Sequence, residues 1–277
     1  MYSVAKLLHQ AIFLNGTLVN METWPNSTPG RMAMFERAEQ SLFRKVLAAH
    51  SKSPIECFYL ELGVVPFRFQ VMKRRILYYQ TIMKRDNEEI TKRVVLSQMQ
   101  SRIKGDFYMQ VSKDMEDLNI SDNDITSSRS SLEEKVNKQA TNIAFAYLQQ
   151  LARKHSKVNE NLYKDLKGME YFNDARFSPD LVNLLFKFRT RMYDVRNNFR
   201  NKYQQIDILC PLCKLENDTQ EHMFKCSIIQ KAPPDNGTQQ CIYEDIFSSN
   251  TDTLLTVAKK LKELVEAREE ITIDKQT

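Results

Sequence analysis

Four residues toward the carboxy-terminal end most strongly constrain how this chain can fold. Cys210, Cys213, His222 and Cys226 follow the spacing C-x2-C-x8-H-x3-C. A two-residue gap lets two thiolates of one turn reach the same ion, and a histidine and a cysteine four positions apart reach it from one turn of helix. The spacing therefore predicts a small zinc module over 205–228. Because the protein fills every position of the tetrahedron, the expected cofactor is a single structural Zn²⁺ ion.

Two other interpretations of these residues stay open. Buried free cysteines and a surface histidine could fall together by chance, or Cys210 and Cys213 could form a redox pair. The chain has five cysteines, an odd number, which favours a metal site in a reducing compartment over a disulfide framework. Three thiolates and a neutral imidazole around Zn²⁺ carry a formal charge of about −1. Lys214 and Lys225 would partly offset that charge.

The composition indicates a mainly α-helical globular chain. Of its 277 residues, 42% are hydrophobic, 27% are charged and only six are glycine. So few glycines disfavour turn-rich β folds and glycine-rich phosphate loops, and no small-molecule substrate is expected. No apolar run approaches the roughly 18 residues of a membrane span, and residues 1–30 lack the regions of a signal peptide. We expect an intracellular protein, in the nucleus, the cytoplasm or both, with no membrane partner.

Apolar residues at three-to-four spacing predict a series of amphipathic helices. The clearest begins at Ser178-Pro179, where a capping hydroxyl precedes a proline, and its apolar stripe continues to Tyr203. Gly63 is expected to end one helix, and Ser130 or Ser131 to cap another. The helices are expected at 31–50, 55–62, 66–85, 88–103, 107–118, 132–155, 178–203 and 253–270. The helix at 132–155 is expected to bury Val136, Ile143, Phe145, Ala146, Leu148 and Leu151.

Two of these helices carry an excess of cations. The helix at 66–85 has six cations and no acid, interleaved with tyrosine and phenylalanine, and the helix at 178–203 has six cations against two acids. Cations beside aromatic rings are typical of phosphate neutralisation with base stacking. The alternative is a solvated face with structural arginines. We predict nucleic-acid contacts from Arg68, Lys73, Arg74, Arg75, Lys187, Arg189, Arg191, Arg196, Arg200, Lys202, Lys214 and Lys225.

The chain also carries several short motifs from residue 14 to residue 226. They are Leu14-Asn15-Gly16 through Trp24, Tyr59-Leu60-Glu61-Leu62-Gly63 through Pro66 and Arg74-Arg75, Phe188-Arg189-Thr190-Arg191-Met192 through Asn198-Phe199, and Asp218-Thr219-Gln220-Glu221-His222. With the CCHC spacing they resemble the carboxy-terminal part of the reverse transcriptase of non-LTR (LINE-type) retrotransposons. In that family a thumb and linker follow the polymerase palm and hold the template–primer duplex, and a CCHC zinc knuckle comes last.

The resemblance implies a region without the polymerase centre. The family's catalytic aspartates form an adjacent pair that binds two Mg²⁺ ions, and this chain has no adjacent pair of aspartates. Runs of polar residues between the predicted helices indicate a hinge and a linker. The expected segments are the remnant of the palm end at 1–30, a basic thumb-like helical region at 31–118, a hinge at 119–131, a helical linker region at 132–204, the zinc knuckle at 205–228, a linker at 229–252, and a final helix with its tail at 253–277.

Two functions of different class follow, and neither is enzymatic. The first is a non-catalytic, zinc-stabilised fragment of a retrotransposon reverse transcriptase that binds template RNA or target DNA. The second is a helical interaction protein whose zinc module docks a protein partner, with the amphipathic helix at 253–270 as a further surface. A degenerate element copy, a truncated copy and a domesticated host protein are all compatible with the sequence.

Overall fold

The computed structural model describes residues 9–23, 29–154, 162–198, 208–229 and 243–274. Within these ranges the regular elements are helices, which confirms the predicted mainly α class. None of the described helices is long and apolar enough to cross a bilayer. The elements are η1 (His9–Leu14), α2 (Asn15–Thr17), η2 (Met21–Thr23), α3 (Pro29–Val46), α4 (Ile55–Leu62), α5 (Phe67–Met83), α6 (Ile90–Ser101), α7 (Phe107–Asp117), α8 (Asp122–Thr126), α9 (Arg129–Ala152), η4 (Glu170–Phe172), α10 (Pro179–Arg189), α11 (Gln220–Met223), η5 (Tyr243–Phe247) and α12 (Thr251–Asp274).

Several helix ends lie where local sequence signals predict them. Gly63 adopts a φ of 64° and ends α4. Only glycine fits there, because a Cβ would lie 2.3 Å from the backbone of Lys167. Ser178 begins α10 by accepting a hydrogen bond from the N–H of Leu181 at 3.4 Å. Both signals depend on neighbouring residues alone, which is why the sequence is sufficient to predict them.

The long helix α9 packs on α4 and α5 through a stripe of residues at four-residue spacing. Val136 and Leu148 are buried as predicted, but Ala146 is exposed. The cap is Ser128, not Ser130 or Ser131. Alanines in the stripe let the neighbouring backbones approach closely, and a search for large apolar residues overlooks them. The stripe consists of Leu132, Val136, Ala140, Ala144, Leu148 and Ala152.

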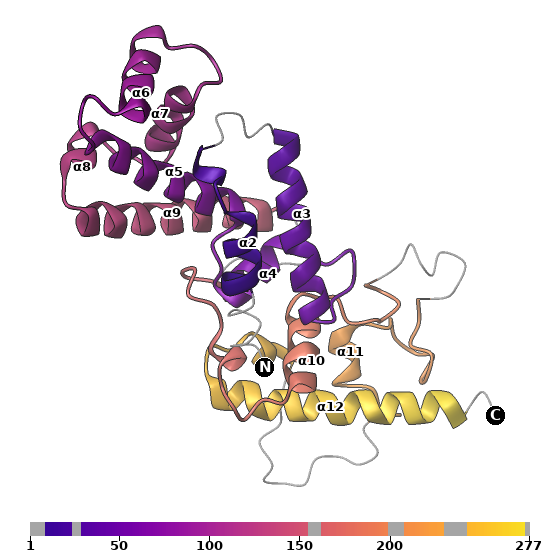
Figure 1. Cartoon of the computed structure of the whole chain (residues 1–277). Coiled ribbons are helices and arrows are strands. Elements are labelled where there is room, and N and C mark those ends of the chain that lie inside the picture. The colour runs from indigo at the N-terminus through magenta and orange to yellow at the C-terminus, as the bar shows by residue number, and fades with distance from the viewer. Residues whose placement is uncertain (1–8, 24–28, 155–161, 199–207, 230–242, 275–277) are drawn as a thin grey trace.

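The segment at 119–131, predicted as a hinge, contains the short helix α8. Ser121 and Asp124 cap this helix through reciprocal side-chain and backbone hydrogen bonds. The amide of Gln80, on α5, donates to the carbonyl of Ile125 at 3.1 Å. In Figure 1, α6, α7 and α8 lie together at one end of the molecule, with α5 and α9 running side by side from it. Contacts therefore cross the boundary that the sequence suggested.

The buried carboxylate of Glu61 joins α4 to the part of the molecule that contains α10 and η5. It accepts hydrogen bonds from the hydroxyls of Tyr163 and Tyr171, both at 2.6 Å. Arg189, at the end of α10, donates to the same carboxylate at 2.9 Å and to the carbonyl of Ile246 in η5 at 2.5 Å. A buried ion pair offsets its desolvation only when such additional hydrogen bonds satisfy it. This network therefore fixes α4 against α10 and η5.

Helix α10 ends at Arg189, well before the Tyr203 that the apolar spacing predicts. Arg191 follows in a left-handed conformation with a φ of 52°, and the chain reverses. Val195 is nevertheless fully buried. The apolar spacing persists although the helix does not, because the reversed chain returns to the same core. Residues 199–207 lie outside the described ranges.

Helix α12 packs its apolar face on the protein itself. This face contacts α10, η4 and η5. In Figure 1, α12 runs along the base of the molecule from η5 past α10 to the region of α11. The stripe predicted as a surface for a partner is thus covered within the chain. Of the predicted stripe, Leu254, Ala258 and Leu261 are buried, while Leu255 and Val265 are partly buried against the core; Val257 and Leu264 are buried beside them.

The buried pair of Glu61 and Arg189 leads to a stability prediction. Arg189→Met keeps most of the side-chain volume but leaves the Glu61 charge without its cation, so we expect the free energy of unfolding to fall by about 3–5 kcal/mol. The control is Lys262→Met, which removes an exposed ion pair with Glu266 and should change that energy by less than about 1 kcal/mol. Urea unfolding measures the free energy of unfolding of both variants. An equal loss of stability in the two would contradict a structural role for the buried Glu61–Arg189 pair.

Candidate metal centre

A tight turn brings the first two cysteines together. An isolated β-bridge closes the loop at 209–217. Beside it, the N–H of Cys210 donates to the carbonyl of Glu216 at 2.7 Å. Lys214, with a φ of 60°, donates its N–H to the carbonyl of Cys210 at 3.0 Å. This turn returns the thiol of Cys213 to the neighbourhood of the first thiol.

The short helix α11 supplies His222, and the turn that follows it supplies Cys226. Thr219 caps it by accepting a hydrogen bond from the N–H of His222 at 2.9 Å. The N–H of Cys226 donates to the carbonyl of His222 at 2.7 Å. His222 and Cys226 therefore lie one turn apart, as their spacing predicts.

The four ligand atoms form a compact cluster and lie within 4.8 Å of one another. The sulfurs of Cys210 and Cys226 are 4.0 Å apart, and the Cys213 sulfur is 3.3 Å from Nε2 of His222. Thiolates bound at about 2.3 Å to one tetrahedral zinc lie about 3.8 Å apart. The cluster could therefore hold one metal ion such as zinc. The four residues that the sequence spacing predicted to lie together do lie together.

A carboxylate orients the histidine of the cluster. Nδ1 of His222 lies 3.0 Å from Oε2 of Glu216. This contact favours the tautomer with hydrogen on Nδ1, which leaves Nε2 free to bind a metal. Glu216 was not among the predicted site residues, because a glutamate six positions before a histidine belongs to no motif until the turn between them is known.

The thiols differ in acidity. Burial opposes ionisation of Cys213, but the backbone N–H groups of Leu215 and Glu216, with the side chains of Cys210 and His222, lower its pKa to about 6. Burial, together with the nearby Cys226, raises the pKa of Cys210 to about 11. Metal ligation deprotonates such thiols, so binding should release protons and weaken in acid.

The cluster is built into the helical fold through Asp218. Its fully buried carboxylate accepts two hydrogen bonds from Arg268 of α12, at 2.7 and 2.8 Å. It also accepts the backbone N–H of Arg196 at 2.8 Å, in the segment that follows α10. On α11, Gln220 donates to the carbonyl of Phe188 at 3.4 Å. The module is therefore part of the α10–α12 end of the protein and not an appended finger.

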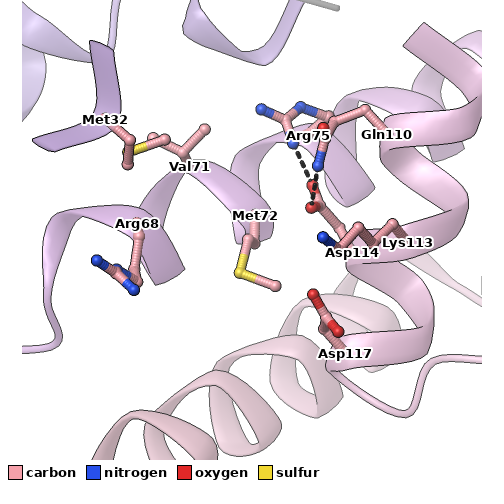
Figure 2. A pocket seen from close by; sticks show the side chains of 9 residues that line it. All are labelled: Met32, Arg68, Val71, Met72, Arg75, Gln110, Lys113, Asp114 and Asp117. Carbon is pink, nitrogen blue, oxygen red and sulfur yellow. Dashed lines mark hydrogen bonds and ion pairs between the residues drawn. The ribbon is translucent and has the colours of Figure 1, made fainter. Parts of the chain in front are cut away.

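Two of the cations predicted on α5 lie against acids from other helices. Arg68 pairs with Glu36 of α3, and Arg75 is buried against Asp114 of α7. Figure 2 shows these two arginines on either side of a cavity of about 240 Å³. Burial lowers the pKa of Lys73. Much of the cation excess of α5 is thus neutralised by acids distant in sequence, and Arg75 is not placed to contact a nucleic acid.

The aromatic residues of α5 also lie in the core. Phe67, Phe69 and Tyr79 are buried. Tyr78 is half-buried, with its ring packed edge-on against Phe107 at 5.9 Å. These rings were expected to stack on bases, but they pack on other helices instead. Their spacing on α5 reflects a helix that contacts neighbours on several sides.

The remaining predicted cations differ in exposure. Arg189 is fully buried with Glu61, which corrects the prediction that it faces nucleic acid. Arg191 is half-buried, 3.7 Å from Glu221 of α11. Arg74, Lys187 and Arg196 are half-buried and Lys214 and Lys225 exposed, while Arg200 and Lys202 lie outside the described residues.

Comparisons with known proteins do not assign this chain to a family. No family model, no curated protein and no solved structure matches the chain. The candidate site is therefore defined by its own geometry, which is a metal-ligand cluster with a supporting carboxylate inside a helical fold.

The contact between Glu216 and His222 can be tested by metal affinity. Glu216→Gln keeps the side-chain size but removes the carboxylate, so we expect affinity for Co²⁺ to fall on the order of tenfold. Glu221→Gln is the matched control, because Glu221 is the residue before His222 but pairs with Arg191. Titration with Co²⁺ against a competing chelator measures both variants. Equal affinities would contradict the orienting role.

Proposed function

We propose that the protein is a non-catalytic nucleic-acid-binding protein in which one structural Zn²⁺ ion shapes a knuckle that contacts the nucleic acid. The observation that carries the proposal is the closed ligand set. Cys210, Cys213, His222 and Cys226 offer four ligand atoms within 4.8 Å of one another, enough to complete the tetrahedron of one Zn²⁺ ion without a water or a substrate. Such a site supplies structure, not hydrolysis. The resemblance to the post-palm region of LINE-type reverse transcriptases supports the same function.

The exposed edge of the knuckle has side chains suited to a single strand. Lys214 and Lys225 are exposed, and Leu215 is 78% exposed beside Lys214. Lysines neutralise phosphates, and an apolar side chain on a fixed turn offers a surface to an unstacked base or sugar. The left-handed conformation of Lys214 fixes the direction of this edge. We therefore assign the knuckle edge, and not α5, as the nucleic-acid contact.

A helical zinc-containing protein-interaction module is the second candidate. Binding through α12 has little support, since the apolar face of α12 packs on α10, η4 and η5, and its Arg268 pairs with Asp218. If the protein is such a module, its partner would therefore dock on the knuckle and not on α12. Partners that survive nuclease treatment would favour it over nucleic-acid binding.

The zinc part of the proposal predicts metal content and its structural effect. Protein purified without chelator should contain about one zinc per chain. Chelation or Cys213→Ser should unfold 208–229. Because Asp218 in that segment holds Arg268, hydrogen exchange should also rise in the last turns of α12, while α9 keeps its protection.

Cys57→Ser is the matched control, because Cys57 is buried outside the cluster. This variant should keep its zinc. Metal content near zero, or unchanged exchange in α12 after chelation, would contradict the coupling between the ion and the fold.

The nucleic-acid part predicts a salt-dependent loss of binding. Lys214→Gln with Lys225→Gln should weaken binding to single-stranded DNA and hairpin RNA, and reduce the slope of log affinity against log salt by about one per lysine. Leu215→Ala should weaken binding without changing the slope. The control is Lys138→Gln with Lys259→Gln, two exposed lysines on α9 and α12. Fluorescence anisotropy that detects no binding at low salt would refute the proposal.

A further inference from the structure

Helix α6 and the turn after it form a cationic surface that sequence analysis did not single out. Between Ile90 and Lys104 the chain has four cations and no acid. Val95 is the buried side chain of α6. The exposed polar side chains include Arg93, Ser97, Gln100, Ser101, Arg102 and Lys104. A helix that contributes so little to the core keeps most of its surface available to a partner.

The acids nearest along the chain are engaged elsewhere. Glu89, just before α6, pairs with Arg85 at 3.1 Å. Asp106, just after the turn, caps α7 by accepting the N–H of Met109 at 2.8 Å. Within the parts of the chain that the structure describes, Arg93 and Arg102 form no ion pair with a carboxylate. This differs from α5, where acids of α3 and α7 pair with the arginines.

The geometry points to a second nucleic-acid contact: we propose that α6 and the turn at 102–105 bind the sugar-phosphate backbone, apart from the knuckle edge. This inference rests on the proposed function. Helix α6 has 12 residues and is therefore about 18 Å long at about 1.5 Å per residue, a length of about five base steps of roughly 3.4 Å.

The neutral residues of this surface favour nucleic acid over a membrane. Ser97, Gln100 and Ser101 are exposed beside the arginines, and hydroxyls and amides are common donors to phosphate and sugar. An interfacial membrane helix needs a continuous face of large apolar residues. On α6 and its turn the exposed large apolar residues are Ile90 and Val94 near the start of the helix and Ile103 in the turn at its other end.

A charge-removal variant tests this second contact in the full chain. Arg93→Gln, Arg102→Gln and Lys104→Gln together should weaken binding to single-stranded DNA and duplex DNA, and reduce the salt slope by about three. The matched control is Arg37→Gln, Lys138→Gln and Lys259→Gln, which removes the same charge from exposed positions on α3, α9 and α12. Circular dichroism confirms that both variants keep their helix content.

The outcomes separate this inference from the proposed function. If the unmodified protein binds nucleic acid and the α6 variant has the same slope as its control, the second contact is wrong and knuckle binding stands. If the α6 variant instead loses binding only to vesicles containing phosphatidylserine, or to an acidic protein partner, α6 is not a nucleic-acid contact. If the unmodified protein binds no nucleic acid, both proposals are wrong.

Discussion

The buried ion pair of Glu61 and Arg189 is the interaction on which the rest of the structure depends. Glu61 is on α4 and Arg189 ends α10, so the pair joins the α3–α9 part of the molecule to the part that holds the metal cluster. Both side chains are fully buried, and two tyrosine hydroxyls and a backbone carbonyl of η5 form further hydrogen bonds with them. After α10 the chain turns at Arg191, and the backbone N–H of Arg196 donates to Asp218, in the loop between the two pairs of candidate ligands. The ion pair and this hydrogen bond therefore connect α4, through α10, to the metal cluster.

Asp218 makes the cluster a structural component of its end of the protein. It links the loop between the two ligand pairs to α12 and to the segment after α10. Cys210, Cys226, Met223 and Ile229 belong to the same hydrophobic core as α10 and α12. A metal ion bound at the four ligands would therefore stabilise more than the short loop that carries them, since binding energy at a site built into a core is folding energy for that core.

Features that depend on a few neighbouring residues could be predicted from the sequence. The mainly α class, the end of α4 at Gly63, the start of α10 at Ser178 and the metal-ligand cluster are all of this kind. Features that depend on distant partners could not. The acids that pair with Arg68 and Arg75 come from other helices, and the apolar spacing after Arg189 persists through a turn. Glu216 and Glu61 have no sequence signal, because their partners meet them only in the folded chain.

We propose that a metal-shaped knuckle binds nucleic acid in this protein. The most direct test is the affinity of the full chain for single-stranded DNA across a salt series, measured as purified, after chelation, and after zinc is restored. If the ion shapes the contact, affinity should fall steeply with salt. After chelation the affinity should be weaker and its dependence on salt shallower, and both should recover with zinc but not with magnesium. Identical affinities in the three states, or affinity independent of salt, would contradict the proposal.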